Sequence, residues 1–152
     1  MRLIAPICLL SLIFMISLPG HSRANEASEI DTIVDNIAGQ YAECAAYYRF
    51  VYFGFVSSNE DEGATAYRQL EDDAMFYSLL LASEGRSQDL AVQVTNSRIE
   101  MYLKKMKLEA DNRNENISIL INKYHFGCND VMENPSQRLL VILARRIEEA
   151  RD

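Results

Sequence analysis

A heptad pattern of apolar side chains runs without a break from residue 30 to residue 55. Its eight positions are spaced alternately four and three residues apart: Ile30, Val34, Ile37, Tyr41, Cys44, Tyr48, Val51 and Phe55. This spacing puts all eight on one stripe of an α-helix, and a stripe of that length needs near-parallel helices to cover it. Ser28 is expected to be the N-cap, with Asp31 three residues on as an acidic variant of the capping box. The pattern therefore favours a helical bundle.

The rest of the chain also carries helical apolar spacing. The positions expected to face inward are Tyr67, Leu70, Ala74, Tyr77 and Leu81 in a second helix, Val92, Thr95, Ile99, Tyr102, Met106 and Ala110 in a third, Ile117, Leu120, Ile121 and Tyr124 in a fourth, and Leu139, Leu140, Leu143 and Ile147 in the last. No stretch shows the alternation of a half-buried strand. The prediction is an all-α bundle of four or five helices with short loops.

Capping and turn residues predict where these helices begin and end. Gly85 is expected just past the second helix, and Ser87 is expected to cap the third. The polar segment 109–116 either turns the chain or forms the exposed middle of one long helix. We interpret it as a turn, because the apolar pattern restarts directly after it. Gly127 is expected to end the fourth helix, and Pro135 to begin the last.

The first 24 residues have the three parts of a secretory signal peptide. Arg2 gives a short positive region, residues 3–18 are almost wholly apolar, and small residues flank a cleavage site after Ala24. The alternative is an uncleaved membrane anchor, but this apolar run is short for a span, which needs about 20 residues. We therefore expect a cleaved signal peptide, residues 1–24, a single helical domain, residues 25–152, and a periplasmic or secreted location.

Length and charge narrow the class of partner. Removal of 24 of the 152 residues would leave 128, which suits one domain with a core of its own. Loss of Arg2 and Arg23 would take the formal net charge from −7 to −9. This acidic balance argues against nucleic acid as a partner, since a phosphate backbone requires clustered Lys and Arg. No membrane span is expected after signal cleavage, and a basic partner remains open.

Two cysteines, Cys44 and Cys128, remain in the expected mature chain. Export makes a disulfide between them feasible. Such a bond would enclose about 85 residues and stabilise the fold by about 4–5 kcal/mol in the loop-entropy model. The alternative is a redox pair, but redox cysteines usually form a C-x-x-C at a helix N-terminus. Because Cys44 lies on the apolar stripe inside a helix, we favour the structural disulfide.

No catalytic residue, metal site or cofactor is expected. His125 is the only histidine after cleavage, which excludes the paired Glu-x-x-His motifs of di-metal bundles, and Cys128 lacks the context of a haem attachment motif. There is no Gly-x-Ser-x-Gly nucleophile motif. The consecutive acids Glu71, Asp72 and Asp73 point in different directions on a helix, so we interpret them as a solvated face.

The C-terminal end of the first helix is apolar nearly all round, because aromatic residues occupy its outer positions as well as its stripe. Either other helices cover it on every side, as is usual for such a helix, or part of it stays open as a groove or association face. In the second case Tyr47, Phe50 and Phe53 would be the candidate binding residues.

The run Glu43-Cys44-Ala45-Ala46-Tyr47-Tyr48, the distant Cys128 and the proline-started last helix form a pattern. It resembles small exported proteobacterial all-helical proteins that have one cysteine pair and no assigned function. The resemblance implies a compartment and transfers no site residues. We expect a non-enzymatic binding module that engages a protein partner or an apolar ligand in the cell envelope. The alternatives are an immunity or inhibitor protein against a periplasmic toxin or hydrolase, and a helical redox protein or enzyme using the cysteines or His125. A homodimer would also fit.

Overall fold

The computed structural model describes the backbone of residues 21–151 and the side chains of residues 30–113, 115–142, 144 and 148. The expected signal peptide, residues 1–24, therefore lies outside the described residues except for the backbone of its last four. Within residues 21–151 the chain forms five α-helices and one short 3₁₀ helix, with no strand: α1 (His21–Ser57), α2 (Asp61–Ala82), α3 (Gln88–Glu109), η1 (Asn114–Asn116), α4 (Ile117–Glu133) and α5 (Pro135–Arg151). The predicted all-α bundle is confirmed.

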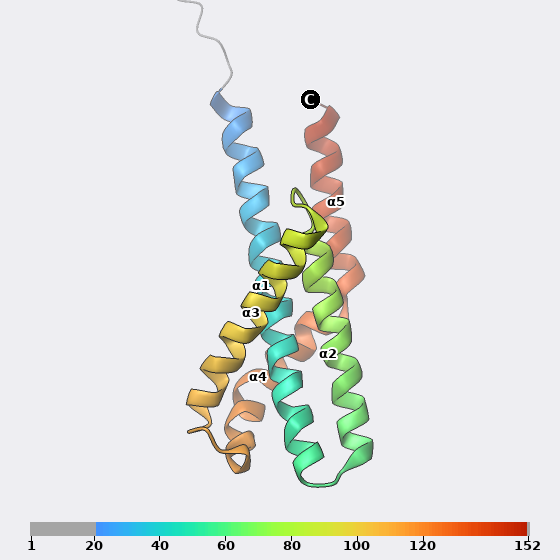
Figure 1. Ribbon diagram of the computed structural model, residues 1–152. Coiled ribbons are helices and arrows are strands. Elements are labelled where there is room, and N and C mark those ends of the chain that lie inside the picture. The colour runs from blue at the N-terminus through green and yellow to red at the C-terminus, as the bar shows by residue number, and fades with distance from the viewer. Residues whose placement is uncertain (1–20, 152) are drawn as a thin grey trace, which may run out of the picture.

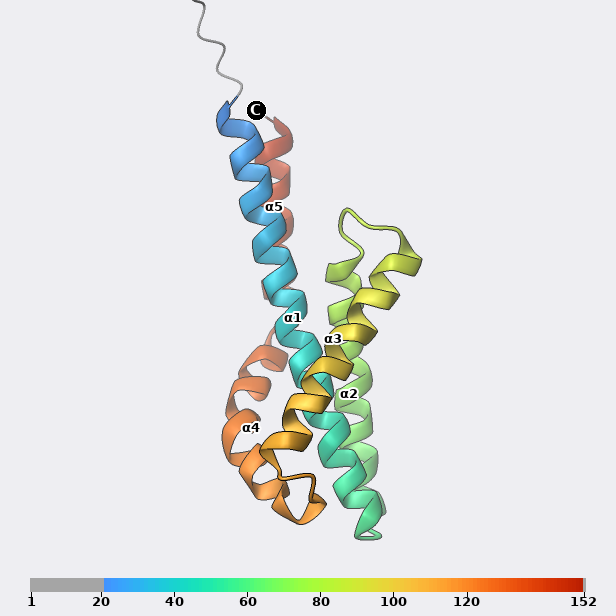
Figure 2. The same cartoon turned by 60° about the vertical axis from the view of Figure 1, so that its left-hand side comes forward.

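Helix α1 is the central element of the bundle (Figure 1). Its C-terminal half is packed against α2, α3 and α4, while α5 lies beside its N-terminal half, as the second view also shows (Figure 2). The two ends of the described chain lie at one end of the molecule. The α1–α2 turn and the α3–α4 connection lie at the other end, which leaves that end clear of both termini.

The heptad stripe of α1 lies in the core as predicted. Six of its eight residues are buried, and the other two, Ile37 and Phe55, are half-buried and pack against the core. The opposite face of α1 is also covered, because small residues at Ala42 and Ala46 allow neighbouring helices to approach closely. Burial on both faces explains why this helix is apolar nearly all round.

The predicted disulfide joins α1 to α4. Cys44 and Cys128 are bonded, with their Cα atoms 5.3 Å apart, and each residue is only 3% exposed. The bond ties the middle of α1 to the buried face of α4, which also carries Leu120, Tyr124 and Val131. It therefore anchors one core helix to another.

Several predicted helix boundaries are confirmed and two are wrong. Ser87 caps α3 by accepting a hydrogen bond from the Leu90 amide, and α5 begins at Pro135. Segment 110–113 is a turn, with Asp111 and Asn112 in the left-handed region. However, α1 begins at His21, upstream of Ser28.

The other wrong boundary is at Gly127, which lies inside α4 and does not end it; the helix continues to Glu133. The reason is packing, since α4 must continue past Gly127 to bury Cys128 and Val131.

Two predicted inward positions are also wrong. Val92 is exposed near the start of α3, where the buried line passes through Ala91 instead. Leu140 is 63% exposed on α5, where Ile142 is the buried position instead. The side chains of Leu143 and Ile147 lie outside the described residues.

Candidate functional site

Two of the three residues that were predicted to form an aromatic binding surface are buried. Tyr47 is fully buried, with its ring centroid 5.2 Å from that of Tyr48 and 6.1 Å from that of Tyr124 on α4. Phe50 is also buried, at 6% exposed. At the level of these residues three helices surround α1, so the open-groove hypothesis is wrong for Tyr47 and Phe50. Phe53 alone of the three candidates is exposed.

The last turns of α1 are less well covered. Phe53 is 53% exposed and Val56 is 46% exposed, while the half-buried Tyr52 ring lies 5.3 Å from the Phe53 ring. We call these three residues the aromatic tip. In Figure 1, α3 crosses α1 at an angle, and its C-terminal end lies to one side of the end of α1. The sequence pattern identifies the aromatic excess but not the level at which α3 diverges.

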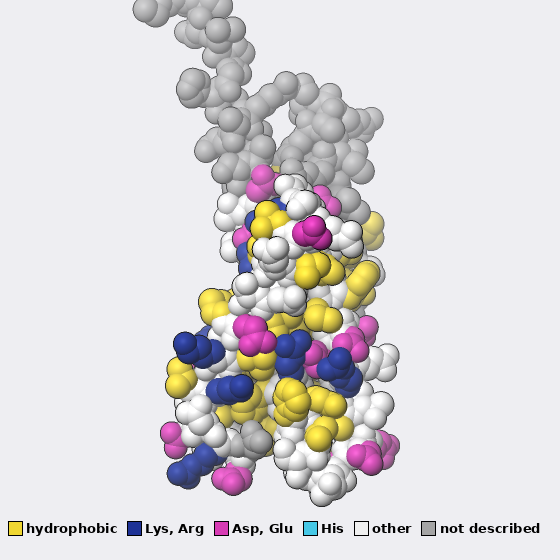
Figure 3. Space-filling model, in the orientation of Figure 1, with side chains coloured by type: hydrophobic (Ala, Val, Ile, Leu, Met, Phe, Trp, Pro, Cys, Tyr) yellow, Lys and Arg dark blue, Asp and Glu magenta, His cyan; other side chains and the backbone are white. Residues whose placement is uncertain are grey.

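A cleft of about 520 Å³ lies beside the aromatic tip, between the end of α1 and the first turns of α2. Its lining includes Tyr52 and Val56 from α1 and Thr65, Arg68 and Asp72 from α2. The Arg68 guanidinium lies 5.8 Å from the centroid of the Tyr52 ring, within range of a cation–π interaction. In the space-filling view, hydrophobic side chains gather in the lower half of the molecule with charged groups of both signs among them (Figure 3).

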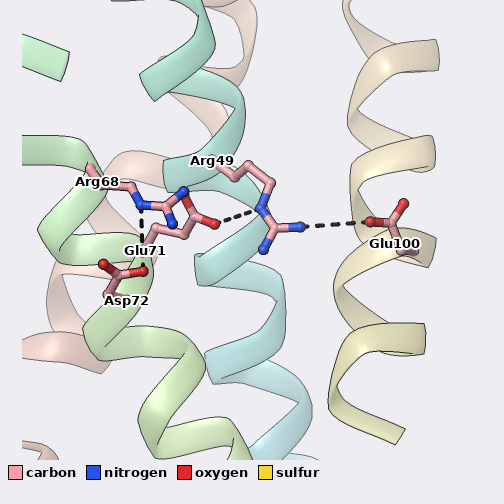
Figure 4. A network of polar contacts seen from close by, with 5 residues as sticks. All are labelled: Arg49, Arg68, Glu71, Asp72 and Glu100. Carbon is pink, nitrogen blue, oxygen red and sulfur yellow. Dashed lines mark hydrogen bonds and ion pairs between the residues drawn. The ribbon is translucent and has the colours of Figure 1, made fainter. Parts of the chain in front are cut away.

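A network of charged side chains lies beside this cleft (Figure 4). The Glu71 carboxylate is buried, with a side chain 1% exposed, and accepts hydrogen bonds from Arg49 Nε at 2.6 Å and Arg68 Nη1 at 3.3 Å. Arg49 also reaches Glu100 on α3 at 3.6 Å, and Arg68 reaches Asp72 at 3.6 Å. The network links three helices and positions Arg68 at the cleft.

The solvated-face interpretation is therefore wrong for Glu71, although Asp72 and Asp73 are exposed as predicted. The missed signal is the spacing of Glu71 with Ala74, Ser78 and Leu81, which places the acid on the buried face of α2. A carboxylate on that face requires a cation beside it, and the half-buried Arg49 supplies it from α1.

The structure places the metal-ligating, cysteine and tyrosine side chains of the described residues as follows. The described residues contain no group of three or more His, Cys, Asp or Glu side chains placed to hold a metal ion. The disulfide is buried, and the hydroxyls of Tyr41, Tyr47 and Tyr48 are buried without a hydrogen-bond partner in the described part of the chain. Burial, with a smaller contribution from Tyr67, raises the pKa of Tyr48 to about 12, so this phenol stays neutral at ordinary pH.

The comparisons with known proteins return no match: no family model, no curated protein and no solved structure resembles this chain. Within the described residues, no helix is long and apolar enough to cross a membrane. Any function must therefore be argued from the chain's own residues.

Proposed function

We propose that this protein is a small exported, non-enzymatic binding module that engages a protein partner through the aromatic tip of α1. The observation that carries the proposal is the exposure of Phe53 and Val56 beside an open cleft. Exposed aromatic side chains on a rigid element are typical anchors of protein interfaces, because they bury a large area at a low entropic cost.

The setting of the tip supports this role. The ion-pair network of Glu71 lies next to it, and the disulfide fastens α1 to α4, so little order would have to be gained on binding. The cleft is open and partly lined by charged groups, which favours a protein surface over an apolar small molecule as its occupant. The signal-like N-terminus and the cysteine pair support an oxidising compartment such as the periplasm.

A second candidate function is inhibition of, or immunity against, a basic toxin or hydrolase. The formal net charge of −7 favours it, because an acidic protein attracts a basic target at long range. A redox function has less support, since the cysteine pair is buried and presents no accessible sulfur.

The test is a comparison of the partners captured by three matched baits. Wild-type protein, Phe53→Asp and Phe126→Asp would each be immobilised and exposed to the native envelope fraction. Phe126 is 81% exposed on α4 and does not belong to the tip, so it controls for loss of a surface aromatic. We expect a partner that binds wild type and Phe126→Asp but not Phe53→Asp, with all three proteins equally helical by circular dichroism. Retention of every partner by Phe53→Asp would contradict the proposal.

A further inference from the structure

Helix α5 is apolar around its whole circumference in one stretch. Residues 139–143 are five consecutive aliphatic residues, and Ala144 follows them. Because an α-helix has about 3.6 residues per turn, a run of this length points in every direction from the helix axis. A helix that is apolar all round is normally covered on all sides. In the described chain, α5 has one helix beside it along its length: it runs antiparallel to the N-terminal half of α1 and stands clear of α2 and α3 (Figure 1, Figure 2).

The contact with α1 uses only one side of α5, on which Ile142 is 7% exposed. Leu140 and Val141 are 63% and 62% exposed, and Ala144 is exposed as well. Ala144 is a surface neighbour of both, because it follows Val141 by three residues and Leu140 by four. The uncovered side of α5 is therefore a continuous apolar strip, in which Ala144 is small enough to let another helix approach closely.

The apolar strip continues onto α1 across a groove of about 280 Å³. Val141 lines this groove from α5, and the half-buried Ile33 and Ile37 line it from α1. The charged residue in its described lining, Arg138, already pairs with Asp130, so the groove offers its occupant apolar contact. We call α5 and the N-terminal half of α1 beside it the arm. The arm face, as we call its apolar surface, consists of Ile33, Ile37, Leu140, Val141 and Ala144.

The two helices of the arm carry opposite charge. Residues 24–48, which include the arm part of α1, contain five Asp or Glu and no Lys or Arg, whereas α5 contains four Arg and two Glu. A second copy of this chain offers the same pair of helices, so a two-fold arrangement can place the basic α5 of each copy beside the acidic α1 of the other. Opposite charges then meet at both contacts. A uniformly acidic or uniformly basic partner would instead meet one helix of like charge.

The size of the arm also suits a dimer interface. With a rise of about 1.5 Å per residue, the 17 residues of α5 span about 25 Å, and two adjacent helices are about 20 Å wide. Covering such a face on each of two copies removes about 1,000 Å² of surface in total, which is near the lower limit for a specific interface. We therefore expect a dimer that dissociates at micromolar concentrations, not an obligate one.

We propose that the arm face is the interface of a homodimer, in which two copies of this chain pair their arms into a four-helix bundle. Two antiparallel helices from each copy make such a bundle, and each helix then has two neighbours. The exposed strip of α5 is covered in this arrangement by α1 of the other copy. This inference goes beyond the proposed function and does not depend on it, because the arm and the aromatic tip lie at opposite ends of the molecule.

The test is sedimentation equilibrium of the disulfide-bonded exported chain at increasing concentration. We expect the mass to rise from that of one chain toward that of two. Leu140→Glu and Ala144→Glu should each weaken the dimer at least about tenfold, because each would bury an unpaired charge in the interface. Both positions are exposed in a single copy, so circular dichroism at low concentration should show an unchanged helix content.

The matched control is Leu108→Glu, because Leu108 is 65% exposed on α3 and lies outside the arm face. It should leave the dimer unchanged. A protein that stays monomeric at every concentration would overturn the inference, as would a dimer that both α5 variants form as tightly as wild type. Equal weakening by Leu108→Glu would also overturn it, since the interface would then not be specific to the arm.

A photo-reactive benzophenone side chain at position 140 tests which helices pair. Isotope-labelled and unlabelled copies would be mixed before irradiation, so that mass spectrometry of the cross-linked peptides separates links between copies from links within one. We expect links between copies that join α5 of one to residues 24–48 of the other. Links from position 140 to α2 or α3 of the other copy, or no link between copies at all, would overturn the pairing of the arms.

Discussion

The Glu71 carboxylate is buried, and its burial determines how the stability of the protein responds when its ion-pair partners are mutated. The carboxylate is neutralised by two arginines that differ in exposure: the Arg49 side chain is 23% exposed and Arg68 is 52% exposed. Removing the acid leaves two cations that can turn toward water. Removing Arg49 leaves a buried carboxylate with only the longer contact to Arg68. The two partners of one ion pair are therefore not equivalent.

We expect Arg49→Met to cost about 3 kcal/mol of stability, because it strands a buried charge. Glu71→Gln should cost less, about 1–2 kcal/mol, since a neutral amide can still accept from Arg49. Urea unfolding followed by circular dichroism would measure both. Asp72→Asn is the control, and should stay within about 0.5 kcal/mol because its pair with Arg68 is solvent-exposed. A larger loss for Glu71→Gln than for Arg49→Met would contradict this account.

The candidate site was only partly predictable from single residues. The aromatic excess of α1 is visible in the sequence, and of the three candidates it suggests, Phe53 is exposed. The sequence does not show that α4 covers Tyr47 or that α3 crosses α1 at an angle, because both depend on how the helices pack. Glu71 was missed because three consecutive acids suggest a solvated face, although only one of them lies on the buried side.

Among the elements, α4 offers a direct test of how a glycine functions inside a helix. Gly127 has a negative φ and a Cβ added there would meet no atom within 4 Å, so Gly127→Ala should stabilise the protein by up to about 1 kcal/mol through helix propensity. Gly85, with φ +70°, is the matched control. Gly85→Ala should destabilise by about 1 kcal/mol, because a side chain is strained in that conformation. Destabilisation by Gly127→Ala would show that α4 ends there after all.

The disulfide belongs to the same element. Because α4 buries a single face against α1, we expect the double variant Cys44→Ala with Cys128→Ala to lose about 2–4 kcal/mol of stability. The loss should be seen as faster amide hydrogen exchange in α4 than in α2. Capture of the partner through the aromatic tip should survive in the folded variant. If a still-folded double variant lost binding, the cysteines would have a role beyond structure.

Element types were easier to predict than element ends. The heptad stripe of α1 predicts its burial well, because eight consecutive positions agree. Helix ends depend on one or two residues, and packing overrides them: α4 continues through Gly127 because the residues beyond it are buried. Leu140 of α5 is exposed although the apolar pattern placed it inward, since a stripe shows which residues prefer burial but not whether a neighbouring helix is there to cover them.

At the scale of the molecule, the aromatic tip and the ends of the described chain lie at opposite ends of the bundle. The two ends of the described chain lie together, while the cleft beside the aromatic tip lies near the α1–α2 turn at the far end of the bundle. Between them the core is held by the disulfide and by tyrosines packed around α1. Because those tyrosines are buried as neutral phenols, we expect their ionisation at high pH to lower the stability of the bundle.

Burial raises the pKa of Tyr41, Tyr47 and Tyr48, in the last case to about 12, whereas an unfolded chain titrates near 10. A folded-state pKa above the unfolded value means that this contribution to stability is complete below about pH 10 and is lost as pH rises through about 12. We expect the free energy of unfolding to fall steadily over that window. The tyrosinate absorbance of the buried residues should rise together with the loss of helical circular dichroism.

Tyr48→Phe should leave neutral-pH stability nearly unchanged, since the Tyr48 hydroxyl has no partner among the described residues, and should make the alkaline decline in the free energy of unfolding shallower. A decline as steep as in wild type would show that Tyr48 does not contribute to it.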